Sequence, residues 1–126
     1  MEIEKTKTSN AELWIEDGIY ILIHKADKTT SLETVQDHLR LHIELSGGKK
    51  MPLFIDMTGQ IGASPEAREF GNSDEIKQTY SAIGLLVGSV FNRVLGSLFM
   101  TINKPPYPVK MFATKEEAME WLQQFK

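Results

Sequence analysis

The hydrophobic and polar positions along this chain form two alternating patterns, one typical of strands and the other of helices. Two β-prone runs at residues 12–16 and 19–24 flank Asp17-Gly18, a strong signal for a tight turn, so the pattern predicts an opening β-hairpin. Short, nearly continuous apolar runs at residues 51–57 and 82–87 are typical of strands covered on both faces. A last strand is predicted at residues 109–113, because β-prone residues follow a proline-rich loop there.

The segments between these strands carry signals for helix starts and stops. Thr-x-x-Glu capping boxes at residues 30–33 and 114–117 precede a first and a last helix. Start signals at residues 64–66 and 72–75 predict two short helices, and Ser89 precedes a helix at residues 90–102. Gly47-Gly48 ends the first helix, whose apolar residues recur at helical spacing: Leu32, Val35, Leu39 and Ile43. The last helix has an apolar face made of Ala118, Trp121, Leu122 and Phe125.

The resulting order, ββαβαβαβα, predicts an α/β fold with a mixed, mostly parallel five-stranded sheet. Strands that alternate with helices form parallel sheets with right-handed crossovers, and the hairpin adds one antiparallel strand. The length of 126 residues suits one domain with one core. We therefore expect a single domain at residues 11–126, preceded by a polar N-terminal arm at residues 1–10.

Four segments carry a resemblance to a known family: Leu53-Phe54-Ile55-Asp56-Met57-Thr58-Gly59, Ser64-Pro65-Glu66-Ala67-Arg68, Asn103-Lys104-Pro105-Pro106-Tyr107-Pro108-Val109 and Glu117-Ala118-Met119-Glu120-Trp121-Leu122. With the order of elements, they make the chain resemble the STAS or SpoIIAA-like domain, in particular an uncharacterised bacterial STAS/SEC14-like branch. The resemblance implies a non-catalytic regulatory or protein-interaction domain without a cofactor. The alternative that it implies is a small-molecule or lipid carrier of the SEC14-like kind.

The resemblance also bears on phosphorylation. In anti-sigma-factor antagonists of this fold, a strand ends in an Asp-Leu-Ser-like turn, and a later Asp-Ser-Ser-Gly motif carries the phosphorylated serine. Asp56-Met57-Thr58 is similar to the turn, whereas the motif falls on Ser64-Pro65-Glu66-Ala67, so that Glu66 stands at the serine position. The resemblance therefore implies that the serine switch of the antagonists is missing here. Ser64 is better interpreted as a helix N-cap.

Composition excludes several classes of function. Fourteen Lys and Arg against seventeen Asp and Glu give a net charge of −3, so no broad positive field attracts nucleic acid. The absence of cysteine excludes disulfides, a thiolate nucleophile and zinc sites with Cys ligands. Residues 1–10 are polar and resemble no signal peptide, so we expect a cytoplasmic protein. The apolar window at residues 82–102 contains Asn92 and Arg93 at its centre, which indicates a strand and a helix, not a membrane span.

Candidate polar chemistry is sparse. His38 and His42 have the four-residue spacing of a helical metal pair, but no third ligand is predictable, so we expect no metal site. His24 ends a strand, and we expect its side chain to be satisfied there. Asp56 is the best single acid, at a strand end where α/β sheets bind ligands, although an Asp beside Thr58 and Gly59 more often fixes a turn. Arg68 could bind an anion or be solvated.

The helix at residues 90–102 has more apolar surface than one sheet face can cover, because its apolar residues spread over about half its circumference. We therefore expect Leu95, Phe99 and Ile102 to have a second neighbour. It could be the loop at residues 105–108, which contains Tyr107, another subunit, or a bound apolar ligand. Met100 lies at the margin of this face and suits an adaptable contact. The pattern favours a homodimer contact or a ligand groove here.

Overall fold

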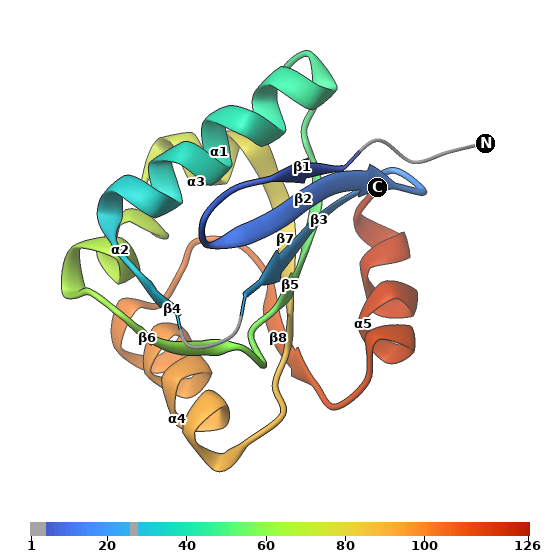
Figure 1. Cartoon of the computed structure of the whole chain (residues 1–126). Helices are drawn as coiled ribbons and strands as arrows, with labels where there is room; N and C mark the ends of the chain where they lie inside the picture. The colour runs from blue at the N-terminus through green and yellow to red at the C-terminus, as the bar shows by residue number, and fades with distance from the viewer. Residues whose placement is uncertain (1–4, 26–27) are drawn as a thin grey trace.

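A six-stranded mixed sheet forms the centre of the protein (Figure 1). The computed structural model describes residues 5–25 and 28–126, without the side chains of Lys28, Ile102 and Asn103. The strand order is β1-β2-β3-β5-β7-β8, in which β1 and β2 are antiparallel to their neighbours and the strands from β3 onward run parallel. The bounds are Thr6–Lys7 for β1, Ala11–Glu16 for β2, Ile19–His24 for β3, Met51–Asp56 for β5, Tyr80–Leu86 for β7 and Val109–Phe112 for β8.

The five predicted strands are all present, and the α/β class is confirmed. The count of five was too low, because β1 adds a sixth strand from within the predicted polar arm. A second, two-stranded parallel sheet pairs β4 (Lys28–Thr30) with β6 (Gln60–Ala63). β1, β4 and β6 have two to four residues each and few apolar side chains, so their sequence carries no periodic signal. The predicted hairpin turn is confirmed by positive φ angles of 52° at Asp17 and 73° at Gly18.

The helices divide between the two faces of the sheet (Figure 1). One face is covered by α1 (Leu32–Ser46), α2 (Pro65–Phe70), α3 (Asp74–Thr79) and α4 (Val90–Leu98), which continues into a π-helical turn, η1 (Phe99–Asn103). The other face is covered by α5 (Lys115–Leu122), followed by a short 3₁₀ turn, η2 (Gln123–Phe125). The predicted helices are therefore confirmed, with the long one at residues 90–102 divided into α4 and η1.

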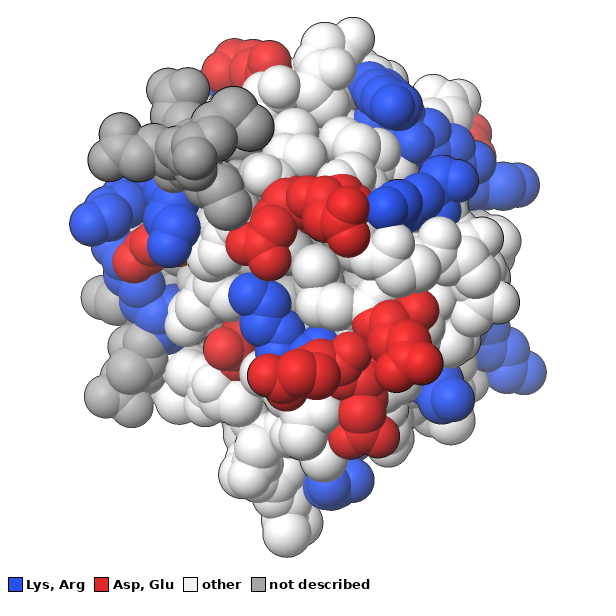
Figure 2. Space-filling view, turned by 90° about the vertical axis from the view of Figure 1, so that its right-hand side faces the viewer, with Lys and Arg blue, Asp and Glu red and all other residues white. Residues whose placement is uncertain are grey.

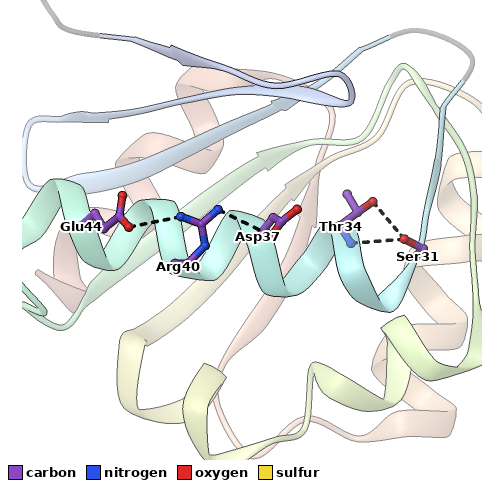
Figure 3. A network of polar contacts seen from close by, with 5 residues as sticks. All are labelled: Ser31, Thr34, Asp37, Arg40 and Glu44. Atoms are coloured by element: carbon purple, nitrogen blue, oxygen red, sulfur yellow. Dashed lines mark hydrogen bonds and ion pairs between the residues drawn. The ribbon is translucent and has the colours of Figure 1, made fainter.

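Side-chain caps fix where these helices begin. Thr114 accepts a hydrogen bond from the backbone N–H of Glu117, as its capping box predicts. At α1, however, the N-cap is Ser31 and not Thr30: its Oγ accepts from the N–H of Thr34 at 3.2 Å. Figure 3 shows this cap together with Arg40, which bridges two acidic residues farther along the exposed side of the helix. The polar network on this side leaves the opposite side of α1 to face the sheet.

The core lies in two separate layers, one on each face of the sheet. The larger layer packs under α1 to α4 and includes Tyr20, Leu22, Leu53 and Tyr80. The smaller layer packs under α5, where Gly84 of β7 allows close approach, since a Cβ there would lie 3.2 Å from Leu122 Cδ1. Gly84 therefore serves the close packing of α5 on the sheet. The division leaves the larger layer to enclose the candidate site.

A register shift between β5 and β7 places the ring of Tyr80 in the larger core layer. Along β5 and β7, Met51 pairs with Tyr80 and Leu53 pairs with Ile83, so β7 advances by three residues where β5 advances by two. Side chains along a regular strand alternate between faces, and the irregularity brings both Tyr80 and Ile83 onto the side of α1. Both residues line the cavity described next.

Candidate functional site

A cavity of about 140 Å³ lies in the larger core layer, between the sheet and the helices on that face. Its walls come from β3, β5 and β7, from α1 to α4, and from the loop that contains Tyr107. Most of its lining is apolar or aromatic: Leu22, Val35, Leu53, Ile55, Met57, Ala63, Ala67, Ile76, Tyr80, Ile83, Leu85, Leu95, Phe99 and Tyr107. Protein interiors are normally close-packed, so an apolar void of this size is a candidate ligand site.

Two histidines form part of the cavity wall. His24 is the last residue of β3, on the same face as Leu22, and His38 lies on α1 with its ring centroid 5.9 Å from that of His24. His24 is 7% exposed, and its Nδ1 is buried without a hydrogen-bond partner among the residues that the structure describes. The expectation of a satisfied strand-end side chain was therefore wrong for this nitrogen.

Burial keeps both of these rings neutral near pH 7. Desolvation lowers the pKa of His24 to about 4, and the positive charge of a protonated His38 would act in the same direction. Desolvation likewise lowers the pKa of His38 to about 4, while the carboxylate of Asp37 partly opposes the change. A neutral imidazole carries one donor and one acceptor nitrogen. The cavity therefore offers uncharged hydrogen-bonding groups in an apolar wall.

Two of the other three polar lining residues have hydrogen-bond partners within the protein, and the third is buried. Arg68 donates from Nη1 to the carbonyl oxygen of Ala63 at 3.1 Å, so its guanidinium is tied to the backbone. The amide of Gln60 donates to the carbonyl of Gly62. Thr30 is buried at the end of β4. These contacts fix the loop and strand ends that surround the cavity.

A close contact between α2 and η1 forms one end of the cavity. A Cβ at Gly71 would lie 2.5 Å from Cε1 of Phe99, so only glycine allows the ring to lie where it does. The hydroxyl of Tyr107 donates to the carbonyl of Gly71 at 2.7 Å, and burial raises the pKa of this phenol. The loop of Tyr107 was one of the three neighbours expected for the apolar helix face, and it does pack here.

His42 takes no part in the cavity. Its Nε2 lies 3.1 Å from the carbonyl oxygen of Ile21, and its Nδ1 lies 2.7 Å from the hydroxyl of Tyr80. A carbonyl only accepts, so Nε2 carries the proton and Nδ1 accepts from Tyr80. Both nitrogens are thus engaged within the protein. Among the described residues, no three His, Asp or Glu side chains are placed to hold a metal ion.

Several residues singled out from the sequence lie outside the cavity. Asp56 accepts from both the backbone N–H and the hydroxyl of Thr58, at 2.9 and 2.6 Å, which is the turn geometry expected of it. Ser64 caps α2 by accepting from the N–H of Ala67, as predicted. Glu66 is exposed in the first turn of that helix. Among the candidate residues whose side chains the structure describes, only Arg68, Leu95, Phe99 and Tyr107 line the cavity.

The outer side of α4 is apolar. Leu95 is buried and Phe99 packs against the core, so neither belongs to a surplus outer face. The side chain of Ile102 lies outside the described residues, and Met100 is partly buried in η1. The outer face consists instead of residues that are 79, 52, 52 and 36% exposed: Val90, Phe91, Val94 and Leu98. The sequence located an apolar surplus on this helix, and the exposed part of that surplus lies on these four residues.

Gly96 explains this orientation. A Cβ at Gly96 would lie 2.8 Å from Sδ of Met111, so the helix approaches β8 most closely on the side of its glycine. Asn92 lies on the inner side as well, where it accepts from the N–H of Gly88 and donates to the carbonyl of Gln60. A small residue and a satisfied amide therefore mark the inner face. Gly96 was the signal in the sequence that could have located it.

Two further expectations concern the distribution of surface charge and the presence of a membrane span. Figure 2 shows acidic and basic groups interspersed on the face seen from the right of Figure 1, where α5 lies, without a broad basic area. None of the helices within residues 5–25 and 28–126 combines the length and apolar character needed to cross a bilayer. The apolar window at residues 82–102 forms β7, α4 and part of η1, as predicted.

A family model matches residues 13–126 of this chain, from β2 to the end. The chain belongs to DUF7793, a domain of unknown function. No curated protein matches this DUF7793 chain. Among solved structures, it is similar to an uncharacterised protein of the DUF3478 family with a SpoIIAA-like fold from Shewanella loihica PV-4, with a TM-score of 0.58 and 16% identity over 96% of this chain and 92% of that one. The resemblance to the SpoIIAA-like fold is thereby confirmed.

A second solved structure is a protein of unknown function from Arthrobacter sp. FB24. It is 28% identical to this DUF7793 chain, over 95% of this chain and 98% of that one, with a TM-score of 0.33.

Proposed function

We propose that this DUF7793 chain is a non-catalytic binding domain for a small apolar molecule held in the cavity. The observation that supports the proposal is the apolar cavity of about 140 Å³. An apolar void of about 150 Å³ in a protein core is large enough for benzene. Pockets for drug-sized ligands measure roughly 300–1,000 Å³. A carrier, the alternative function that the resemblance implies, would therefore hold a molecule no larger than one ring in this cavity.

The arrangement of polar groups supports a binding role over a catalytic one. The polar residues that line the cavity are His24, Thr30, His38, Gln60 and Arg68. No hydrogen bond within the described part of the chain joins the side chains of any two of them. Nucleophilic catalysis places a nucleophile within reach of a base that is itself oriented by a third group. The lining offers isolated polar groups in an apolar wall, which is the composition of a binding pocket.

The test uses toluene as the probe and thermal unfolding as the measurement. A ligand that binds only the folded state stabilises it by about 1.4 kcal/mol at ten times its Kd, which raises the Tm by a few degrees. In Ala67→Leu, extra methyl groups enter the cavity at a buried lining position on α2 and should abolish this rise. The same substitution at exposed Ala113, outside the lining, should leave the rise unchanged. Equal toluene responses in wild type and Ala67→Leu, or no response in wild type, would overturn the proposal.

A second candidate function is that of a protein-interaction domain, as expected of a regulatory STAS-like protein. The observation that favours it is the outer face of α4, defined by Val90, Phe91, Val94 and Leu98. Contiguous exposed apolar side chains often mark contacts with other proteins. If a second copy of this chain is the partner, Phe91→Glu should lower the mass measured by sedimentation to that of a monomer. An unchanged mass would exclude the homodimer through this face.

We further propose that regulation by the serine switch of the antagonists is absent, because Glu66 stands at the position of the serine. Its exposed carboxylate in the first turn of α2 is favourable by some tenths of a kcal/mol. Stoichiometric phosphate on Ser64 or Thr58 after incubation with an anti-sigma-type kinase would contradict this.

A further inference from the structure

The exposed apolar side chains of this protein are concentrated around one helix. Six large apolar side chains are exposed within the described part of the chain, and four of them form the outer face of α4. A fifth, Ile61, is 51% exposed on β6, the strand that is joined to α4 by a hydrogen bond from Asn92 to the carbonyl of Gln60. Monomeric soluble proteins rarely leave such side chains grouped together without a use. The outer face of α4 is therefore a candidate docking surface.

The charge of this segment is positive only. The chain contains 17 Asp and Glu, yet none lies between Glu75 and Glu116. The charged residues of α4, of η1 and of the turn that follows are Arg93 and Lys104, and both are exposed. Arg93 lies one helical turn after Val90, at the margin of the apolar face. The face thus combines apolar side chains with basic groups, which suits a partner that is apolar and negatively charged.

A second copy of this chain fits the face less well than a bilayer does. In a two-fold contact the same patch faces itself, so this segment would bring Arg93 and Lys104 of both copies together without an acidic residue of its own. The helix has nine residues, whereas a stable protein interface takes about 20–30 residues from each partner. A bilayer sets no such minimum, because its affinity for a surface helix grows with the apolar area that enters it and with the attraction of anionic lipids for basic residues.

We propose that the outer face of α4 docks on the surface of an anionic lipid bilayer. The helix lies in the plane of the interface, with Phe91 and its apolar neighbours among the acyl chains and Arg93 and Lys104 at the level of the phosphates. The inner side of the same helix contributes Leu95 to the cavity wall. Docking therefore brings the cavity close to the apolar phase in which small apolar molecules accumulate. This last link rests on the proposed binding function, whereas docking itself goes beyond it.

The experiment measures how much protein sediments with vesicles. Wild type should bind vesicles of equal parts phosphatidylglycerol and phosphatidylcholine, and should bind phosphatidylcholine alone more weakly. Phe91→Glu should lower the partition coefficient at least about tenfold, because the buried phenyl ring is lost. Arg93→Gln should lower it about fivefold on the anionic vesicles only. The matched control is Ile43→Glu on α1, an exposed apolar position at the opposite end of the molecule, which should bind as wild type does (Figure 1).

Each contrary outcome identifies what is wrong. Wild type that stays in the supernatant with anionic vesicles overturns the proposal. Equal losses in Phe91→Glu and Ile43→Glu overturn it too, because binding would not occur through α4. A dimer that Phe91→Glu reduces to a monomer, without vesicle binding by either form, assigns the face to a protein contact instead. The toluene response is measured without vesicles and Phe91 lies outside the cavity lining, so failure of docking and failure of the binding function are distinguishable.

A second measurement uses the absence of cysteine from the chain. Val94→Cys offers a single thiol on the outer face, which is labelled with a fluorophore that responds to the polarity of its surroundings. Anionic vesicles should shift its emission to the blue, as expected of a label that leaves water. The same label at Ile43→Cys should show no shift. Protein that sediments with the vesicles while the label at Val94 remains in water would refute docking through this face.

Discussion

The hydroxyl of Tyr80 donates to Nδ1 of His42 across 2.7 Å, and this buried pair joins α1 to strand β7, in the interior of the sheet. The pair is fixed from the other side by Ile21 of β3, whose carbonyl accepts from Nε2 of the same ring. Burial raises the pKa of Tyr80, so its hydroxyl keeps the proton that it donates. One imidazole thus connects a helix to two strands beside the candidate cavity.

Tyr80→Phe should lower the free energy of unfolding by about 1–3 kcal/mol, because Nδ1 of His42 would remain buried without a donor. Urea unfolding measures the change. In a His42→Leu background the same substitution should cost much less, since no nitrogen is left unpaired. If Tyr80→Phe is equally costly in both backgrounds, packing and not the hydrogen bond explains the loss.

Acid should destabilise the protein through its three histidines. Desolvation lowers the pKa of His24, His38 and His42 from the ordinary 6.5 to about 4 in the folded state. The unfolded chain therefore takes up protons first, and stability that is complete above pH 6.5 is lost as the pH falls toward about 4. Each histidine contributes at most about 1.4 kcal/mol per pH unit.

Urea titrations between pH 7.5 and 4.5 measure this dependence. Asp17 does not contribute to the pH dependence in this range. Hydrogen bonding by Gln123 and Lys126 holds its pKa below the ordinary 3.8, so its carboxyl group titrates below pH 4.5. His24→Leu removes one titrating group and should flatten the profile. Stability that is independent of pH over this range would show that the folded histidines titrate normally.

Gly71→Ala should destabilise the protein by about 1–3 kcal/mol through overpacking against Phe99. The backbone at Gly71 has a φ of −59°, which alanine adopts freely, so the 2.5 Å approach to the Phe99 ring is the dominant effect. Gly62→Ala is the matched control, because its Cβ would meet Thr29 at an ordinary 3.8 Å. Equal stability of the two variants by urea unfolding would mean that Phe99 is free to move.

Structural features that depend on residues close together in the sequence could be predicted, whereas features that depend on distant residues could not. Asp17-Gly18 and the capping box at Thr114 act within four residues, and both were predicted correctly. The cavity could not be predicted, because it depends on the register shift that brings Tyr80 and Ile83 to one face. His24 could be assigned to a strand end, but whether its nitrogen is paired depends on neighbours distant in the sequence.

The orientation of α4 can be tested with two adjacent residues. Val94 is 52% exposed on the outer face, whereas Leu95 is 8% exposed and lines the cavity. Val94→Lys should therefore change the free energy of unfolding by no more than about 0.5 kcal/mol, as surface substitutions usually do. Leu95→Lys places an unpaired charge in an apolar core and should cost more than about 3 kcal/mol or prevent folding.

Urea unfolding of both variants decides between the two orientations of the helix. If the outer face contained Leu95 and Phe99 instead, Leu95→Lys would be tolerated and Val94→Lys would not. Val94→Lys also leaves the cavity untouched, so it should retain the toluene response of wild type. A Val94→Lys variant that unfolds, or that loses this response, would show that Val94 contributes to the core although 52% of its surface is exposed.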